Sequence, residues 1–236
     1  MLSTMDRRKI EVEPGIEVAS VWAFPKGAAA RNAPTLILAH GAGSNMEHPF
    51  LSFVQETLTQ RGIITIKFNF PYVEAGRQVP DHPKRLARTW RAVIEHVRTE
   101  VQPSALFLGG RSMGGRIASM VAADGEQVSG LVLLGYPLHP AGRLDALRDA
   151  HLAHIACPML FVQGTRDQLC DLDTLRSVLA RLSAPVTLQL IEQGDHSFKV
   201  PKRTGKTSLQ IWEEIVACVG SWLTKLPPAA VRGEIT

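Results

Sequence analysis

A serine framed by glycines lies between an apolar run and an amphipathic stretch near the middle of the chain. Residues 105–108 (Ala-Leu-Phe-Leu) are typical of a short buried strand, and apolar residues at helical spacing follow from residue 117. The intervening Gly110-Arg111-Ser112-Met113-Gly114 predicts a tight strand-to-helix turn that projects the hydroxyl of Ser112 above a sheet.

The glycines have a steric reason to be there. A strained turn brings the backbone on both sides of the serine close to neighbouring structure, and Gly110 and Gly114 have no Cβ to clash. Ser112 would also lie at a helix N-terminus, where free N–H groups and the helix dipole favour negative charge. The alternative, a glycine-rich loop with an incidental serine, is weaker because the motif stands between a strand and a helix.

Apolar runs suited to buried strands alternate with amphipathic stretches along the whole chain. The expected strands are 9–12, 16–24, 35–39, 63–70, 105–108, 128–134, 158–162 and 185–191; helices are expected at 49–60, 84–100 and 171–182, after Ser112, and at 207–226. The turn at Pro14-Gly15 makes the first two strands an antiparallel hairpin. This alternation predicts an α/β fold with a doubly wound, mostly parallel sheet.

The chain length of 236 residues is enough for one α/β domain with a sizeable core. We assign residues 1–226 to this domain and expect residues 227–236 to be a disordered tail, because Pro227-Pro228 follows the last helical pattern. Residues 138–155 hold one short helix at most, so there is no room for a lid domain at this point.

Three residues with complementary chemistry each follow a predicted strand: Ser112, Asp167 and His196. The carboxyl ends of parallel strands meet at one edge of the sheet, which is where ligands bind in such folds. His196 can take the proton of Ser112, which is a poor nucleophile alone, and Asp167 can hold the imidazole tautomer. The order Ser, Asp, His along the chain is that of the α/β-hydrolase triad.

The identity of the acid has an alternative in Asp195, next to His196 in the sequence. Adjacent side chains on a loop usually diverge, whereas a residue from the neighbouring strand can approach the ring, which favours Asp167. An aspartate in a turn before a helix is also a common helix cap, so a purely structural role for Asp167 stays open.

The strand at 35–39 ends in His40-Gly41-Ala42-Gly43-Ser44. Glycines at this point let backbone N–H groups face a cleft, so Gly41 or Ala42, together with Met113, is expected to form an oxyanion hole. We expect His40 to be structural.

Weaker expectations concern substrate contacts. Tyr72, at the end of a strand, is a candidate pocket residue. Lys202 and Arg203 belong to a basic loop after His196 and could attract a carboxylate or phosphate. The simpler interpretation of that loop is a solvated connection to the last helix.

Composition excludes several other classes. The formal net charge is +4 with basic residues scattered, which is unlike a nucleic-acid-binding surface. Three widely spaced cysteines without C-x-x-C predict neither a disulfide framework nor a zinc site, and the eight histidines show no metal-ligand pattern. No run is long and apolar enough for a membrane span, and no secretory signal is recognisable. We therefore expect a cytoplasmic protein with no metal, cofactor, membrane or nucleic-acid partner.

Four segments together resemble the α/β-hydrolase superfamily over nearly the whole chain: His40–Gly43, Gly110–Gly115, Gly164–Asp167 and Gly194–Phe198. More narrowly, the chain is similar to the small lidless group that contains testis-expressed protein 30 and its bacterial relatives. Dienelactone hydrolases are similar in size and also lack a lid, but carry cysteine where this chain has Ser112.

The resemblance implies a serine hydrolase of unassigned substrate. We expect it to act on a small ester or thioester through an acyl-enzyme. The alternative from another class is a non-catalytic interaction module, because fold alone does not fix function and relatives of this group include a subunit of a histone-acetyltransferase complex. The oligomeric state stays open.

Overall fold

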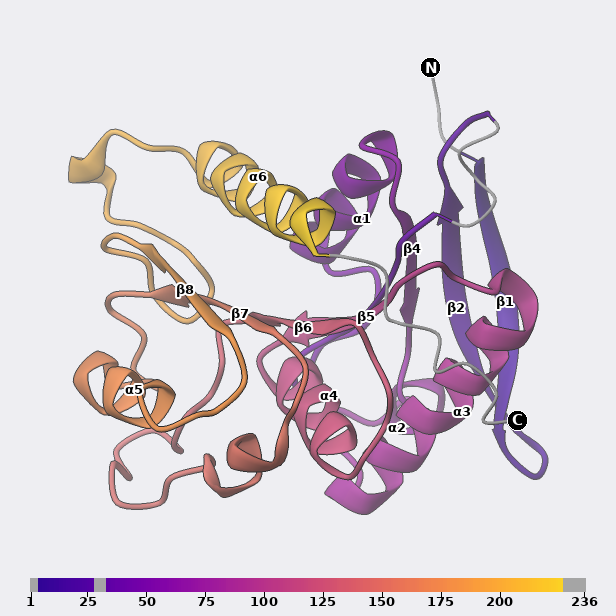
Figure 1. Cartoon of the computed structure of the whole chain (residues 1–236), viewed down its shortest axis with the longest axis horizontal. Coiled ribbons are helices and arrows are strands. Elements are labelled where there is room, and N and C mark those ends of the chain that lie inside the picture. Colours follow the sequence, from indigo (N-terminus) through magenta and orange to yellow (C-terminus); the bar gives the residue numbers. More distant parts are fainter. Residues whose placement is uncertain (1–3, 28–32, 227–236) are drawn as a thin grey trace, which may run out of the picture.

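The computed structural model describes residues 4–27 and 33–226 and is built around one eight-stranded sheet (Figure 1). The strand order is β1-β2-β4-β3-β5-β6-β7-β8. The strands are β1 (Thr4–Glu13), β2 (Ile16–Phe24), β3 (Thr35–Ala39), β4 (Ile64–Phe68), β5 (Leu106–Arg111), β6 (Gly130–Leu134), β7 (Met159–Gly164) and β8 (Val186–Ile191). The helices are α1 (Pro49–Gln60), α2 (Pro71–Glu74), α3 (Pro83–Val101), α4 (Met113–Ala123), α5 (Leu172–Leu179) and α6 (Ser208–Lys225), with 3₁₀ helices η2 (Ala150–His154) and η3 (Lys202–Thr204).

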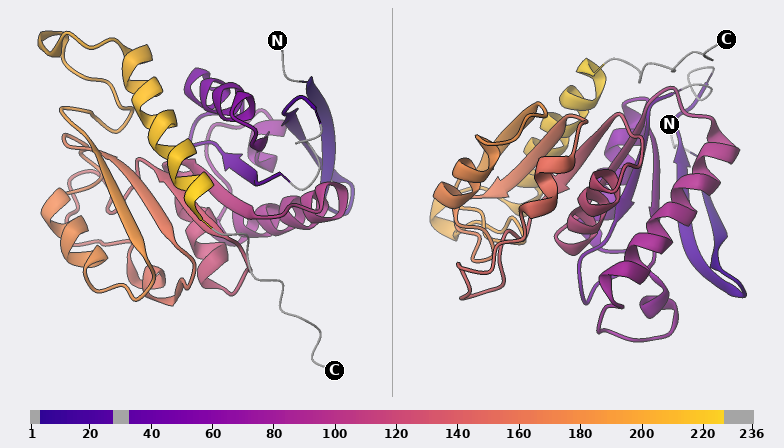
Figure 2. Two further views of the ribbon diagram at one scale, coloured as in Figure 1. Left: turned by 45° about the horizontal axis from the view of Figure 1, so that its top comes forward. Right: turned by 60° about the horizontal axis from the view of Figure 1, so that its bottom comes forward.

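The sheet has the predicted mixture of pairings. Strands β1 and β2 form the antiparallel hairpin, and β2 pairs antiparallel with β4. From β4 to β8 every pairing is parallel. Figure 2 shows the hairpin at one end of the molecule and β8 at the other. The doubly wound, mostly parallel α/β fold predicted from the sequence is therefore confirmed.

Helices cover both faces of the sheet (Figure 1). Along β3, Leu36 and Leu38 pack with α1 and α6, whereas Ile37 and Ala39 pack with the apolar sides of α3 and α4. Alternate residues of one strand thus enter opposite layers, as the two-residue period of a strand requires. The five residues of β3 are all buried, which explains why this strand reads as a continuous apolar run.

The segment after β4 differs from the sequence-based expectation. The strand expected at 63–70 ends at Phe68, and the expected loop contains α2, which begins at Pro71. Proline is favoured at a first helical position because its missing N–H would have no intrahelical partner there. Helix α5 ends at Leu179, before the expected end at residue 182.

Between β6 and β7 the described structure contains only the short η2 helix, so the fold has no lid domain. The expected tail at 227–236, and residues 28–32 of an expected loop, lie outside the described residues. Within the described ranges, each helix is too short or too polar to span a bilayer.

Candidate active site

Ser112 occupies the turn between β5 and α4 in a conformation that non-glycine residues rarely adopt. Its φ is 52° and its ψ is −118°, and a strained conformation of this kind costs about 1–3 kcal/mol. The surroundings hold it there. The N–H of Ser112 donates to the carbonyl oxygen of Leu134 at 2.9 Å, and its own carbonyl accepts from the N–H of Arg116 at 3.0 Å. The turn therefore fixes the direction of the Ser112 side chain.

Close backbone packing explains the two glycines that frame the serine. A Cβ on Gly110 would lie 2.7 Å from the carbonyl oxygen of Ala39, and a Cβ on Gly114 would lie 2.6 Å from that of His40. Real Cβ atoms do not approach backbone so closely. The absence of both side chains lets the elbow pack directly on the end of β3, next to the loop with the expected oxyanion donors.

The structure brings Ser112, His196 and Asp167 together in one chain of hydrogen bonds. Nε2 of His196 lies 2.8 Å from Oγ of Ser112, and Nδ1 of His196 lies 2.7 Å from Oδ2 of Asp167. In the neutral tautomer that donates from Nδ1 to the carboxylate, Nε2 accepts the proton of the serine hydroxyl. This arrangement meets the geometric requirement for a base that activates a nucleophile.

The side chain of Asp167 is fully buried, and its carboxylate has further partners. Oδ1 accepts the N–H of Leu169 at 2.8 Å, and Oδ2 accepts Nε2 of Gln163 at 2.5 Å. The side-chain oxygen of Gln163 accepts the N–H of Tyr136 at 2.8 Å. Sequence reasoning missed Gln163, although a glutamine in the buried run of β7 was a visible hint, since buried polar groups need partners.

Asp195 has a different role from Asp167. Its Oδ1 accepts the backbone N–H groups of Ser197 at 2.7 Å and Lys199 at 2.9 Å. The carboxylate therefore shapes the loop that carries His196 and is not bonded to the imidazole. Gly164 lets that loop approach β7, because a Cβ there would lie 2.6 Å from the carbonyl oxygen of Asp195.

The residues expected to form the oxyanion hole flank Ser112. Gly41 is buried, and a Cβ added to it would lie 3.4 Å from Cβ of Ser112. Ala42 is exposed at the following turn. Met113 is the first residue of α4, a position whose N–H has no intrahelical acceptor. The backbone at Gly41 and the start of α4 thus both lie close to Ser112.

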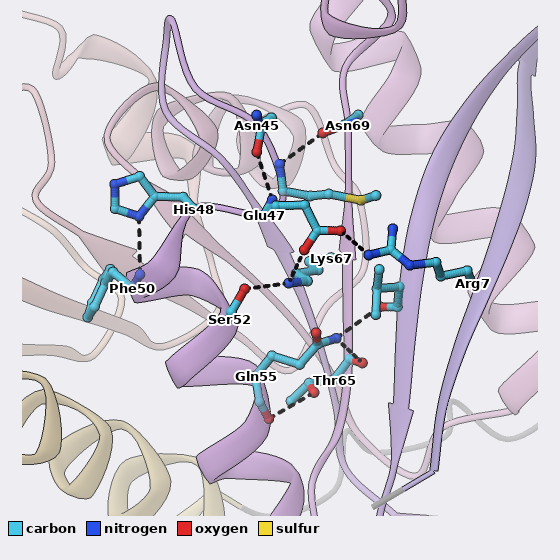
Figure 3. Close-up of polar contacts among 12 residues, drawn as sticks. Arg7, Asn45, Glu47, His48, Phe50, Ser52, Gln55, Thr65, Lys67 and Asn69 are labelled. Carbon is cyan, nitrogen blue, oxygen red and sulfur yellow. Dashed lines mark hydrogen bonds and ion pairs between the residues drawn. The ribbon is translucent and has the colours of Figure 1, made fainter.

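Hydrogen bonds and ion pairs connect the loop after Gly41 to β4 (Figure 3). Nζ of Lys67, on β4, donates to Oγ of Ser52 at 2.7 Å and to Oε2 of Glu47 at 3.2 Å. Arg7 donates to the other oxygen of Glu47 at 2.6 Å. Burial opposes the ionisation of Glu47, but the two cations outweigh it and lower its pKa. Sequence reasoning missed Lys67, whose 3% exposure makes it a buried cation.

His40 is structural, as expected, and links this loop to Phe70, just after the end of β4. Its Nδ1 lies 2.8 Å from the carbonyl oxygen of Gly41, and its Nε2 accepts the N–H of Phe70 at 3.3 Å. The ring is therefore neutral with the proton on Nδ1. Burial is the main reason that its pKa falls from 6.5 to about 4, an effect that the bond to Gly41 partly offsets and the charge of His48 reinforces.

Acidification should therefore destabilise the fold. An unfolded chain binds a proton at His40 near pH 6.5, whereas the native chain resists until about pH 4. Stability contributed by the neutral ring is fully present above pH 6.5 and should fall by up to about 3 kcal/mol as the pH drops towards 4. Urea unfolding at a series of pH values measures how the free energy of unfolding changes with pH. A His40→Gln variant should be less stable at neutral pH, but its free energy of unfolding should depend less steeply on pH. An equally steep dependence in the variant would contradict this assignment.

Tyr72 is not on the surface of the site. It is fully buried and packs on the rings of His40 and Phe70. Tyr72 is therefore a core residue and not the pocket residue that we expected. Lys202 and Arg203 are exposed on η3, and Arg203 donates to the side chain of Gln193 at 3.1 Å.

A cavity of about 590 Å³ lies beside His196. Its lining comes from the loops after β7 and β8 and does not include Lys202 or Arg203. The lining residues are Arg166, Gln168, Leu169, Asp195, His196, Lys199, Val200 and Pro201. Among the residues that the structure describes, no three His, Cys, Asp or Glu side chains are arranged to hold a metal ion.

Comparison with known proteins decides the family. The α/β hydrolase domain family matches residues 32–224. The chain belongs to the α/β-hydrolase family. This membership supports a hydrolase activity, while the narrower resemblance to the group of testis-expressed protein 30 stays a prediction.

Solved structures of α/β hydrolases share the whole fold. A dienelactone hydrolase from Anabaena variabilis superposes with a TM-score of 0.74 at 20% identity, covering 96% of this chain and all of that one. A serine hydrolase without a lid from Xanthomonas campestris gives 0.67 at 22% identity, with 95% and 93% covered. A serine hydrolase homologue from Coxiella burnetii gives 0.70 at 20% identity, with 92% and 95% covered. At these identities the likeness concerns the fold.

Proposed function

We propose that this α/β hydrolase is a serine hydrolase that cleaves a small ester or thioester through an acyl-enzyme. The observation that carries the proposal is the unbroken hydrogen-bonded chain from Ser112 through His196 to Asp167. It lies at the carboxyl edge of the parallel strands, where such sheets bind ligands.

Each group has a defined role in this reaction. His196 removes the proton of Ser112 as Oγ attacks the carbonyl carbon of the substrate, forming a C–O bond and a tetrahedral oxyanion. The C–O or C–S bond to the leaving group then breaks, and His196 returns the proton to the departing alcohol or thiol. A water molecule, activated by the same imidazole, attacks the acyl-enzyme and releases the acid and Ser112. Asp167 stabilises the imidazolium in both halves.

The negative charge of the tetrahedral oxygen needs donors placed in advance. The backbone N–H of Met113 at the start of α4 and an N–H from Gly41 or Ala42 are proposed to supply them. Removing one such donor typically costs about 10²- to 10³-fold in rate. The anchoring of the neighbouring loop by Lys67 and His40 supports this role, because catalytic donors act best when they are held rigidly.

Reaction with a fluorophosphonate probe tests the proposal directly. Native protein should form a covalent adduct at Ser112, located by mass spectrometry of the peptide. Protein unfolded in denaturant should not react, because the nucleophile depends on its neighbours. Absence of labelling in well-folded protein would favour the alternative of a non-catalytic interaction module.

The missing lid leads to a prediction about acyl length. Without a lid, the site has few apolar walls to bury a long chain, and each fully buried methylene is worth about 0.8 kcal/mol. Acetyl and butyryl esters should therefore be hydrolysed in preference to palmitoyl esters, without activation at a lipid interface. Values of kcat/KM over a series of acyl lengths, measured below the micellar range, check this. A clear preference for palmitoyl would contradict it.

A further inference from the structure

Arg111 is a half-buried cation directly before Ser112 in the chain. Its Nη2 donates to Oγ of Ser197 at 2.8 Å, on the loop that carries His196. In the described part of the chain this is the side chain's one hydrogen bond, and no carboxylate lies within ion-pairing distance of it. A guanidinium has five N–H donors, so most of its capacity is unused.

The two acids whose charges act on Arg111 already have other hydrogen-bond partners. Asp167 binds His196, Gln163 and Leu169, and Asp195 accepts two N–H groups of its own loop. Burial lowers the pKa of Arg111, an effect that the charges of these two aspartates partly offset. Burial lowers the pKa of His48, and the charge of Arg111 lowers it further. The bond to Ser197 and the close approach to Gly41 place Arg111 between the loop of His196 and the loop that follows Gly41.

The free N–H groups of Arg111 are open to a ligand. In residues 4–27 and 33–226, the buried side-chain nitrogen and oxygen atoms without a partner belong to Tyr72, Asp81 and Trp90. Because Arg111 is not among them, its unbonded nitrogens are in contact with solvent. A half-buried guanidinium is desolvated enough to bind an anion well, and it matches a carboxylate with two parallel hydrogen bonds.

Arg111 is also close to the proposed nucleophile. The position that a Cβ on Gly41 would take is 3.5 Å from Nη1 of Arg111 and 3.4 Å from Cβ of Ser112. The separation of Nη1 from Cβ of Ser112 therefore cannot exceed the sum of these distances. A short acyl chain attached to Ser112 can span this gap past the bare backbone of Gly41.

We propose that Arg111 binds a carboxylate at the far end of a short acyl chain, so that the preferred substrates are half-esters or half-thioesters of short dicarboxylic acids. This inference rests on the proposed serine hydrolase function and names its substrate class. It assigns selectivity to a residue inside the elbow motif, and not to the exposed cations Lys202 and Arg203.

Two esters that differ in charge and little in shape test the inference. The anionic ester is the para-nitrophenyl half-ester of succinic acid, and the neutral one is para-nitrophenyl levulinate, in which a methyl ketone replaces the carboxylate. The rate with Ser112→Ala is subtracted, because the carboxylate of the half-ester can attack its own ester. Wild-type protein should prefer the anionic ester in kcat/KM. Arg111→Gln should lower the anionic-to-neutral ratio by about ten- to a hundredfold, as expected for lost charged hydrogen bonds.

Matched variants separate recognition from loop positioning and from general charge attraction. Ser197→Ala removes the bond from Arg111 to the loop of His196 and should leave the anionic-to-neutral ratio unchanged. If Arg111 only positions that loop, both variants should slow both esters in parallel, which would overturn the inference. If Lys202→Gln lowers the ratio as much as Arg111→Gln, the selectivity comes from the surface field and the inference fails.

Product inhibition gives a second measurement. Succinate should inhibit levulinate ester hydrolysis competitively and more strongly than levulinate does, and Arg111→Gln should remove that difference. Equal inhibition by the two acids in wild type would overturn the inference. If wild type hydrolyses levulinate esters but shows no preference for the anion, only this inference fails. If it hydrolyses neither ester and does not react with the fluorophosphonate, the proposed function fails.

Discussion

Replacing Ser112 with alanine is expected to abolish hydrolysis. The hydroxyl oxygen is the atom proposed to form the acyl-enzyme, and no other side chain is bonded to Nε2 of His196 in the described structure. Removal of the nucleophile from a serine protease lowers kcat by on the order of 10⁶-fold, and a similar loss is expected here. The measurement is the rate on a short aryl ester, together with labelling by the fluorophosphonate. Wild-type activity in the variant would remove Ser112 from the mechanism.

A matched control shows whether the loss is chemical or structural. Alanine keeps the Cβ and therefore keeps the strain of the φ value of 52° at this turn. Glycine at the same position relieves that strain, because it reaches positive φ without a steric penalty. Ser112→Gly and Ser112→Ala should both be inactive. The glycine variant should be the more stable of the two by up to about 1–3 kcal/mol in urea unfolding.

The sequence was sufficient for features that depend on local pattern. The parallel strands read as apolar runs because they are buried on both faces, as β3 is. The elbow could be predicted because a tight turn between a strand and a helix always brings the backbone into close contact. That contact requires glycines at fixed positions around the serine. The order of Ser112, Asp167 and His196 placed all three at one edge, since each follows a parallel strand.

Features that depend on partners distant in the chain could not be predicted from the sequence. Helix α2 forms where a loop was expected, and its residue Tyr72 becomes part of the core by packing on His40, 32 positions away. Lys67 and Glu47 are 20 positions apart, and Arg111 and Ser197 are 86 apart. Nothing in the local sequence around any of these residues identifies its partner. Their roles follow only from the packing of loops at the carboxyl edge of the sheet.

The choice between the two candidate acids shows how the structure adds to the sequence. The sequence favoured Asp167, which follows the neighbouring strand, but kept Asp195 as an alternative because it adjoins His196. The hydrogen bonds distinguish them: Asp167 reaches the imidazole, whereas Asp195 accepts N–H groups of its own loop. This difference leads to opposite expectations for the same chemical change at the two positions.

Asp167→Asn is expected to lower kcat by on the order of 10⁴-fold, as the same exchange does in a protease triad. Gln163 donates to Oδ2 and Leu169 donates to Oδ1, so each carboxylate oxygen already accepts a hydrogen bond. The NH2 group of an asparagine would therefore face one of these donors. If the amide nitrogen faces Nδ1 of His196, it forces the imidazole proton onto Nε2. That nitrogen then cannot accept the proton of Ser112, and the base is lost without any change in the fold.

Asp195→Asn provides the control with the same change of charge. The Oδ1 of an asparagine there can still accept the N–H groups of Ser197 and Lys199, so the loop should keep its shape. The rate should fall by less than about tenfold, because the change only weakens these bonds and the net contribution of one neutral hydrogen bond is small. Both variants should be compared by kcat/KM on one neutral ester and by the rate of fluorophosphonate labelling. The reverse ranking would assign the acid role to Asp195, because only the acid that orients the imidazole sets the tautomer on which proton transfer from Ser112 depends.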